Sequence, residues 1–149
     1  MRKPYRKKRG PVNAKKITVD GITFASGLER YMYQALKKAK IPAVYEGHTY
    51  EIFPAFHFDM FAYERCANGK GDYKDRGHKK ILNISYTPDF MGQGFIIECK
   101  GRANESFPLR WKMFKRYVMS HLPGVKLYKP QNQKECDETV RLILKSKSS

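Results

Sequence analysis

The fold is decided by Tyr86-Thr87-Pro88-Asp89-Phe90 and, after seven further residues, by Glu98-Cys99-Lys100-Gly101. Apolar residues predict a strand over 81–91 and a second strand over 95–100. Gly92-Gln93-Gly94 is typical of a tight turn between two such strands. These segments therefore predict an antiparallel β-hairpin whose two-residue loop is Gln93-Gly94.

The hairpin register places two carboxylates at facing positions. Across a Gln93-Gly94 loop the residue numbers of each pair sum to 187, so Asp89 lies opposite Glu98. Facing Cβ atoms are about 5 Å apart, and two carboxylates that close repel unless a cation or a proton lies between them. Mg²⁺ suits this position because it prefers oxygen and bridges one or two carboxylates to phosphate oxygens. The pattern predicts a Mg²⁺ site in which Mn²⁺ can substitute.

Strand alternation assigns roles to the two residues after Glu98. The side chains of Glu98 and Lys100 share a face with Ile96, whereas Cys99 points the other way, toward the core. A lysine beside a bound cation has a lowered pKa and can orient or deprotonate an attacking water. A bound metal would polarise the phosphate and lower the pKa of its water. The alternative interpretation is a hairpin with a surface Glu98–Lys100 pair.

Glu29 is a third candidate acid. Ser26 and Glu29 match a capping box at the start of a helix expected to run to about Lys40, in which the Glu only satisfies the helix start. Glu29 also lies beside the apolar stripe of that helix, at the edge of its buried face. The capping and catalytic interpretations both stay open.

The rest of the chain predicts a mixed order of elements. Residues 16–24 match a hairpin turning at Asp20-Gly21, and 43–63 match extended structure. Residues 64–80 match a loop or a long hairpin tip. Pro108 opens a helix over 107–122, and a strand over 125–128 and a helix over 134–145 follow, the latter with Cys136, Val140, Ile143 and Leu144 inward. Core or sheet packing, rather than base stacking, is expected of Tyr45, Tyr50, Phe53, Phe56, Phe58 and Phe61.

Charge sets the class of partner. The 149-residue chain has a formal net charge of +16, and residues 1–19 contain eight Lys or Arg and no acid. Such a surplus predicts an anionic partner, with nucleic acid first and an acidic membrane surface second. The predicted DNA contacts lie in the N-terminal arm and on the helix over 107–122, and comprise Arg2, Lys3, Arg6, Lys7, Lys8, Arg9, Lys15, Lys16, Arg110, Lys112, Lys115 and Arg116.

Other classes are excluded by what the sequence lacks. No apolar run approaches the roughly 18 residues of a membrane span, and no apolar segment follows the basic N-terminus as in a secretory signal. The three cysteines are widely separated and form no CxxC pair. They predict a reducing cytoplasm, that of the host if a phage encodes the chain, and no common structural zinc site.

Glu29, Asp89 and the Glu98-x-Lys100 motif together resemble the PD-(D/E)xK nuclease superfamily. More narrowly, the sequence over about 15–120 is similar to the small phage-encoded nucleases related to endonuclease I, the Holliday-junction resolvases. The resemblance implies metal held by Asp89, Glu98 and the Cys99 carbonyl, with Lys100 as catalytic lysine and Glu29 completing the site. It also implies a homodimer with elements exchanged between subunits, although the segment between Glu46 and Ile81 departs from the short endonuclease I pattern.

The sequence thus predicts an α/β protein with a restriction-endonuclease-like mixed sheet flanked by helices. Residues 1–13 are expected to form a flexible basic arm, and 14–149 a single nuclease domain with 64–80 as an insertion. The expected activity is Mg²⁺-dependent cleavage of DNA phosphodiesters, selective for branched junctions. The alternatives are a nicking repair or restriction-type nuclease, since one catalytic set serves many substrates on this fold, and a non-catalytic DNA-binding or packaging protein.

Overall fold

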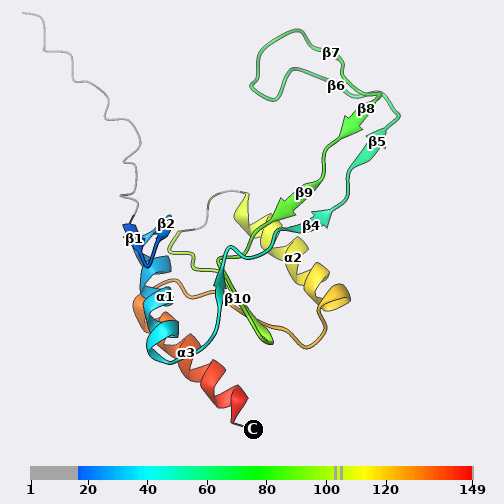
Figure 1. Ribbon diagram of the computed structural model, residues 1–149. Helices are drawn as coiled ribbons and strands as arrows, with labels where there is room; N and C mark the ends of the chain where they lie inside the picture. Colours follow the sequence, from blue (N-terminus) through cyan, green and yellow to red (C-terminus); the bar gives the residue numbers. More distant parts are fainter. Residues whose placement is uncertain (1–16, 103, 105, 149) are drawn as a thin grey trace, which may run out of the picture. The chain divides into compact units, whose positions relative to one another are not determined.

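The computed structural model describes residues 17–102, 104 and 106–148, which form an α/β fold (Figure 1). The helices of these residues are α1 (Gly27–Lys38), α2 (Phe107–His121) and α3 (Gln133–Lys147). Their strands are β1 (Ile17–Val19), β2 (Ile22–Phe24), β3 (Val44–Tyr45), β4 (Tyr50–Phe53), β5 (Phe56–Phe58), β6 (Tyr63–Glu64), β7 (Lys74–Asp75), β8 (Lys79–Ile81), β9 (Ile84–Tyr86), β10 (Phe90–Gly92), β11 (Phe95–Ile97) and β12 (Lys126–Tyr128). The predicted α/β class is confirmed, and the likeness to a restriction-endonuclease core stays a prediction.

The chain divides into two compact units, each built from separate stretches of sequence. Unit 1 combines the chain up to Pro42 with Cys99–Gly101 and everything from Lys129 onward. Unit 2 combines Ala43–Glu98 with Arg102–Tyr128. The boundary between Glu98 and Cys99 therefore falls inside the predicted catalytic motif.

Unit 1 begins with the predicted β1–β2 hairpin. Its turn residues Asp20 and Gly21 have φ values of 52° and 76°, the left-handed backbone that a two-residue hairpin loop requires. The Tyr33 hydroxyl donates to the Asp20 carboxylate at 2.8 Å, and Lys37 forms an ion pair with the same group. The turn is thus tied to α1 by contacts from two of its side chains.

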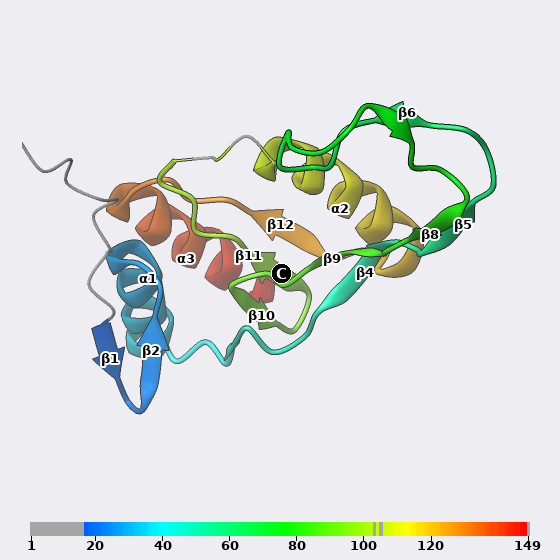
Figure 2. The same cartoon turned by 90° about the horizontal axis from the view of Figure 1, so that it is seen from above.

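Helices α1 and α3 lie side by side in unit 1 (Figure 2). Met32 and Leu36 of α1 are buried, as the predicted stripe requires. Cys136 and Ile143 of α3 are buried as well. Leu144, which the sequence placed inward, is 45% exposed, because the buried stripe of α3 instead runs through Thr139, whose hydroxyl donates to the Glu135 carbonyl.

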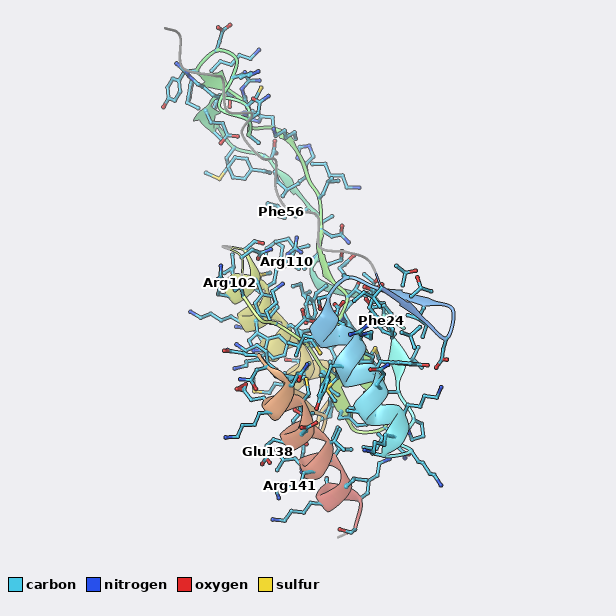
Figure 3. The ribbon with its side chains drawn as sticks, turned by 90° about the vertical axis from the view of Figure 1, so that its left-hand side faces the viewer. Phe24, Phe56, Arg102, Arg110, Glu138 and Arg141 are labelled. Carbon is cyan, nitrogen blue, oxygen red and sulfur yellow. The ribbon has the colours of Figure 1, made fainter. Side chains whose placement is uncertain are left out.

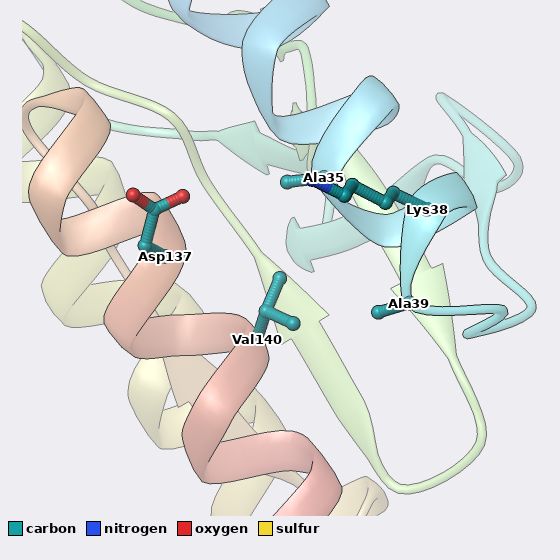
Figure 4. A pocket seen from close by; sticks show the side chains of 5 residues that line it. All are labelled: Ala35, Lys38, Ala39, Asp137 and Val140. Atoms are coloured by element: carbon teal, nitrogen blue, oxygen red, sulfur yellow. The ribbon is translucent and has the colours of Figure 1, made fainter.

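The two helices leave a shallow cavity of about 350 Å³ between them (Figure 4). Small side chains, Ala35 and Ala39, account for the space on α1, and Val140 faces it from α3. Lys38 and Asp137 line its two sides. None of the predicted site residues lines this cavity.

Unit 2 contains a mixed four-stranded sheet in the order β12-β11-β10-β3. Strand β10 is antiparallel to both β11 and β3, whereas β11 and β12 are parallel. Helix α2 packs on this sheet through Trp111, Phe114 and Val118, which share a core cluster with Ile96 of β11. Pro108 lies in the first turn of α2, as predicted.

The predicted continuous strand over 81–91 is wrong in its extent. The chain forms β8, β9 and β10 in succession, separated by short irregular segments. Pro88 lies in the break between β9 and β10, where it has no backbone N–H to donate to a neighbouring strand. The break allows β9 to pair with β4 while β10 pairs with β11.

Residues 54–83 form a two-stranded ribbon, which we call the finger (Figure 1). The β4–β9 pair leads into β5–β8, and β6–β7 closes the tip. Of the two alternatives for 64–80, the hairpin is therefore the one formed. Among the described residues no helix has the length and apolar character needed to cross a bilayer.

Candidate active site

The carboxylates of Asp89 and Glu98 come from neighbouring strands of the unit 2 sheet. Phe90 pairs with Ile97, Met91 with Ile96 and Gly92 with Phe95, and each pair sums to the predicted 187. Gly94 has a φ of 81°, which fits its place in the two-residue loop. Asp89 directly precedes β10 and Glu98 directly follows β11, so each flanks the terminal Phe90–Ile97 pair of this ladder.

Both carboxylates are buried. Asp89 is 7% exposed and Glu98 is 6% exposed, which is unusual for acidic side chains in a chain of this size. Buried acids require hydrogen-bond donors or a cation. The Tyr86 hydroxyl donates to Glu98 Oε2 at 2.6 Å, within the length range of a strong bond to a carboxylate.

Tyr86 is a contributor that sequence reasoning missed. It is 6% exposed and packs against Phe114 with ring centroids 4.6 Å apart. Tyr86 and Ile96 belong to one core cluster, so the Glu98 side chain lies on the Ile96 face of β11, as strand alternation predicts. The sequence signal was weak, because the only indication was that Tyr86 lies two residues before the Pro88-Asp89 motif.

The segment that carries Asp89 is fixed by the chain before β4. The Glu46 N–H donates to the Asp89 carbonyl at 2.8 Å, and the Thr49 and Thr87 hydroxyl oxygens are 2.7 Å apart. Pro88 is fully buried. These contacts hold the backbone on both sides of the carboxylate.

In unit 1, Glu29 both caps the start of α1 and is buried, so it has the features of both interpretations that the sequence left open. Its backbone N–H donates to Ser26 Oγ at 3.2 Å, and its Oε2 accepts from the Ser26 N–H at 3.0 Å, so the capping box is formed. Glu29 is nevertheless only 7% exposed. The capping role is confirmed, and the catalytic role stays a prediction.

Lys100 and Cys99 also belong to unit 1. The Lys100 N–H donates to the Pro130 carbonyl at 3.0 Å, and its side chain is half-buried. Cys99 is 7% exposed, and a hydrogen bond with its thiol lowers the pKa of the buried Cys136. Cys99 therefore points into the core, as predicted.

A family comparison matches residues 9–129 to a model described as a protein of unknown function, DUF1064. The chain belongs to the DUF1064 family. The match includes Glu29, Asp89, Glu98 and Lys100. No curated protein and no solved structure matches the chain.

Carboxylates such as those of Asp89 and Glu98 are the kind of oxygen ligand that a hard divalent cation prefers. Among residues 17–102, 104 and 106–148, no group of three or more His, Cys, Asp or Glu side chains forms a metal cluster. Mg²⁺ does not need one, since it usually keeps several waters and takes one or two carboxylates. Asp89 and Glu98 of unit 2 are two carboxylates of this kind.

The predicted DNA contacts on α2 are all exposed. Arg110, Lys112, Lys115 and Arg116 are exposed to solvent, Figure 3 labels Arg110, and Lys115 Nζ lies 6.0 Å from the centre of the Trp111 ring. Arg116 also lines a groove of about 410 Å³ between α2 and β4, together with Phe53 and Tyr117. The other predicted contacts, from Arg2 to Lys16, lie outside the described residues.

Proposed function

We propose that this DUF1064 protein is a metal-dependent DNA endonuclease. The observation that carries the proposal is the pair of buried carboxylates, Asp89 and Glu98, which flank the terminal Phe90–Ile97 pair of β10 and β11. A bound cation would offset the cost of burying two acids so close together in the chain's fold. Phosphodiester hydrolysis would use such a cation, because the substrate is anionic and a metal ion held by the two carboxylates would lie beside it.

The metal ligands in this proposal are Asp89, Glu98 and the Cys99 carbonyl, and the preferred ion is Mg²⁺, with Mn²⁺ as a substitute. When bound, the ion supplies Lewis acidity toward the phosphate and a more acidic water. Tyr86 keeps the Glu98 carboxylate oriented through its 2.6 Å hydrogen bond. That orientation would otherwise cost rotational entropy each time a substrate binds.

Lys100 is proposed as the residue that positions the attacking water or takes its proton. It follows Glu98 by two residues, just after β11, and its backbone N–H donates to the Pro130 carbonyl. Glu29 is proposed as a further acid of the site. The exposed cations of α2 then hold the DNA through its phosphates without reading the base sequence.

The finer proposal is selectivity for branched DNA by a homodimer, because paired strands at a junction require two cuts. Phosphate contacts alone suit an enzyme that recognises shape rather than sequence. The proposal includes a cytoplasmic site of action, since the three cysteines are free thiols.

The test compares a labelled four-way junction with a linear duplex of the same arm sequence in Mg²⁺, in Mn²⁺ and in EDTA. We expect metal-dependent cutting, faster on the junction. Lys100→Ala should lower the rate by at least about 100-fold and leave salt-sensitive binding unchanged. Equal rates on both DNAs would remove the junction claim. No cutting of either DNA in either metal would remove the nuclease proposal.

A further inference from the structure

The finger exposes large aromatic side chains, which a ribbon with a purely structural role would bury against another part of the protein. Among the described residues, every exposed large aromatic lies within or beside this segment, and Phe61 and Tyr73 are 70% and 72% exposed. Tyr63 is 59% exposed as well. The sequence predicted core or sheet packing for Phe53, Phe56 and Phe61. Phe53 and Phe56 pack edge to face on each other, with centroids 5.9 Å apart (Figure 3 labels Phe56). Phe61, at 70% exposed, has no place in a core.

The tip of the finger is a built structure. The Asp75 carboxylate accepts from the backbone N–H groups of Ala62 and Gly77 at 3.0 and 2.9 Å. The Arg76 side chain donates to the carbonyls of Glu64 and Asp72 at 3.0 and 3.1 Å. The exposed rings are therefore carried on a defined backbone.

The rings are also oriented by neighbours. Phe61 contacts the edge of His78 with centroids 4.8 Å apart, and His78 Nδ1 lies 3.4 Å from Asp59 Oδ1. Tyr63 and Tyr73 lie near each other across β6 and β7, with centroids 6.5 Å apart. Rings restrained in this way lose little entropy when they stack on a ligand.

Charge identifies the occupant. Lys70, Lys74, Lys79 and Lys80 are exposed, and none of them forms an ion pair with a described acid. Asp75, by contrast, is occupied with the backbone and with His78. Residues 54–83 contain six Lys or Arg and four Asp or Glu, and the whole chain has a net charge of +16. A second copy would therefore bring a surface of the same sign, whereas DNA offers phosphates for the lysines and flat bases for the rings.

We propose that the finger binds unpaired DNA bases, stacking them on Phe61, Tyr63 and Tyr73 while its lysines contact the phosphates. Paired bases present only their edges, so the preferred DNA is one in which bases are already unstacked, as at a fork or an opened branch point. This inference rests on the proposed action on DNA and narrows its substrate to DNA with unpaired bases.

The test measures binding in EDTA, where no cleavage is required. Fluorescein-labelled forked DNA with unpaired arms is compared with a fully paired duplex by anisotropy, using wild type and the double variant Phe61→Ala/Tyr73→Ala. We expect wild type to prefer the fork, and the variant to lose about tenfold or more on the fork with little change on the duplex. The control Leu142→Ala/Leu144→Ala, which truncates exposed leucines of α3, should bind as wild type does.

A second readout separates stacking from a structural effect. A 2-aminopurine in the unpaired arm should be quenched by wild type and by the conservative variant Phe61→Tyr/Tyr73→Phe, but not by the alanine variant. Equal binding of fork and duplex by wild type would overturn the inference, even if the protein cuts DNA. A fall in solution mass of the alanine variant would overturn it in favour of a contact between subunits.

Absence of Mg²⁺-dependent cutting on any DNA would remove the nuclease proposal separately. A preference for forked DNA that depends on the rings would then still support binding of unpaired bases by the finger.

Discussion

Two buried tyrosines in the core of unit 2 differ in the acceptor that each hydroxyl finds. The Tyr86 hydroxyl donates to a carboxylate at 2.6 Å, whereas the Tyr50 hydroxyl donates to the Met91 sulfur at 3.6 Å. Both side chains are 6% exposed. Hydrogen bonds to charged groups contribute more than those to weak acceptors such as a thioether, so the two sites should respond differently to loss of the hydroxyl.

Tyr86→Phe keeps the ring packing but leaves Glu98 without this donor. We expect the free energy of unfolding to fall by about 1.5–3 kcal/mol, measured by chemical denaturation at neutral pH. Under the proposed function the cleavage rate should fall as well. The matched control Tyr50→Phe should cost less than about 1 kcal/mol. Equal losses in the two variants would show that the Tyr86–Glu98 bond has no special strength.

The two roles of Glu29 can be separated by substitution. Glu29→Gln retains an oxygen that accepts from the Ser26 N–H but removes the charge, so the unfolding free energy should change by less than about 1 kcal/mol. If Glu29 serves catalysis, cleavage should fall by about 100-fold. Ser26→Ala should give the opposite pattern, with about 1 kcal/mol of stability lost and cleavage retained. Full activity in Glu29→Gln would leave Glu29 with the capping role alone.

At the residue scale, the sequence predicted the features that neighbouring residues determine, namely a hairpin loop and a helix cap. The Gln93-Gly94 loop fixes the predicted register of β10 and β11, and Ser26 fixes the start of α1. The hydrogen bond from Tyr86 could not be predicted, because it depends on how β9 leaves the Pro88 break and approaches β11. Tertiary placement of that kind has no signature in the spacing of residues.

Among the elements, the alternation of apolar side chains predicted where strands form but did not predict which of them are covered by other elements. The extended aromatic segment over 43–63 does contain β3, β4 and β5, but only part of it meets a core. Tyr50 is buried because β4 lies against α2, whereas Phe61 is exposed because no helix or strand among the described residues packs over it. A period of two shows that a residue lies on one face of a strand, without showing whether that face is covered.

Gly77 is required where the two strands of the finger tip approach each other. A Cβ at this position would lie 1.9 Å from the Met60 carbonyl oxygen and 3.0 Å from the Ala62 nitrogen. Both are backbone atoms, so no side-chain rotation can relieve the clash. We expect Gly77→Ala to open the β6–β7 pair and to speed hydrogen exchange at Arg76 and His78.

The exchange rates in α1 should not change in Gly77→Ala, because the damage is confined to the finger. Gly27→Ala is the matched control, since a Cβ there meets no atom within 4 Å. Unchanged exchange across the finger in Gly77→Ala would show that its backbone can shift to admit the methyl group.

The tip of the finger should also respond to acid. Hydrogen bonds from the Ala62 and Gly77 N–H groups hold the pKa of Asp75 below its ordinary value of 3.8. Since the folded pKa is lowered, the stabilising effect is fully present above about pH 5 and is lost as the pH falls through the lowered value. Protection factors of these two amides should therefore be constant from pH 7 to about 5 and fall below that. In Asp75→Asn the fall should disappear.

For the whole molecule, the surplus charge is divided between parts that can be tested apart. The exposed cations of α2 belong to unit 2, whereas Arg2, Lys3, Arg6, Lys7, Lys8 and Arg9 precede the described residues. Removing the latter six lowers the formal net charge from +16 to +10. Each protein cation that contacts a phosphate releases counterions from the DNA. The dependence of the binding constant on salt concentration therefore measures how many of these cations contact phosphate.

Replacing those six N-terminal cations with serine should weaken binding to every DNA sequence alike. If each contacts one phosphate, the slope of log K against log salt should become shallower by about 5. The measurement is anisotropy with a paired duplex over a series of salt concentrations in EDTA. Lys145→Ser/Lys147→Ser, which removes two cations from the last turn of α3, is the control and should leave the slope unchanged. An unchanged slope in the six-fold variant would assign the phosphate contacts to α2 and the finger. Each single lysine substitution there should then make the slope of log K against log salt shallower by about 1.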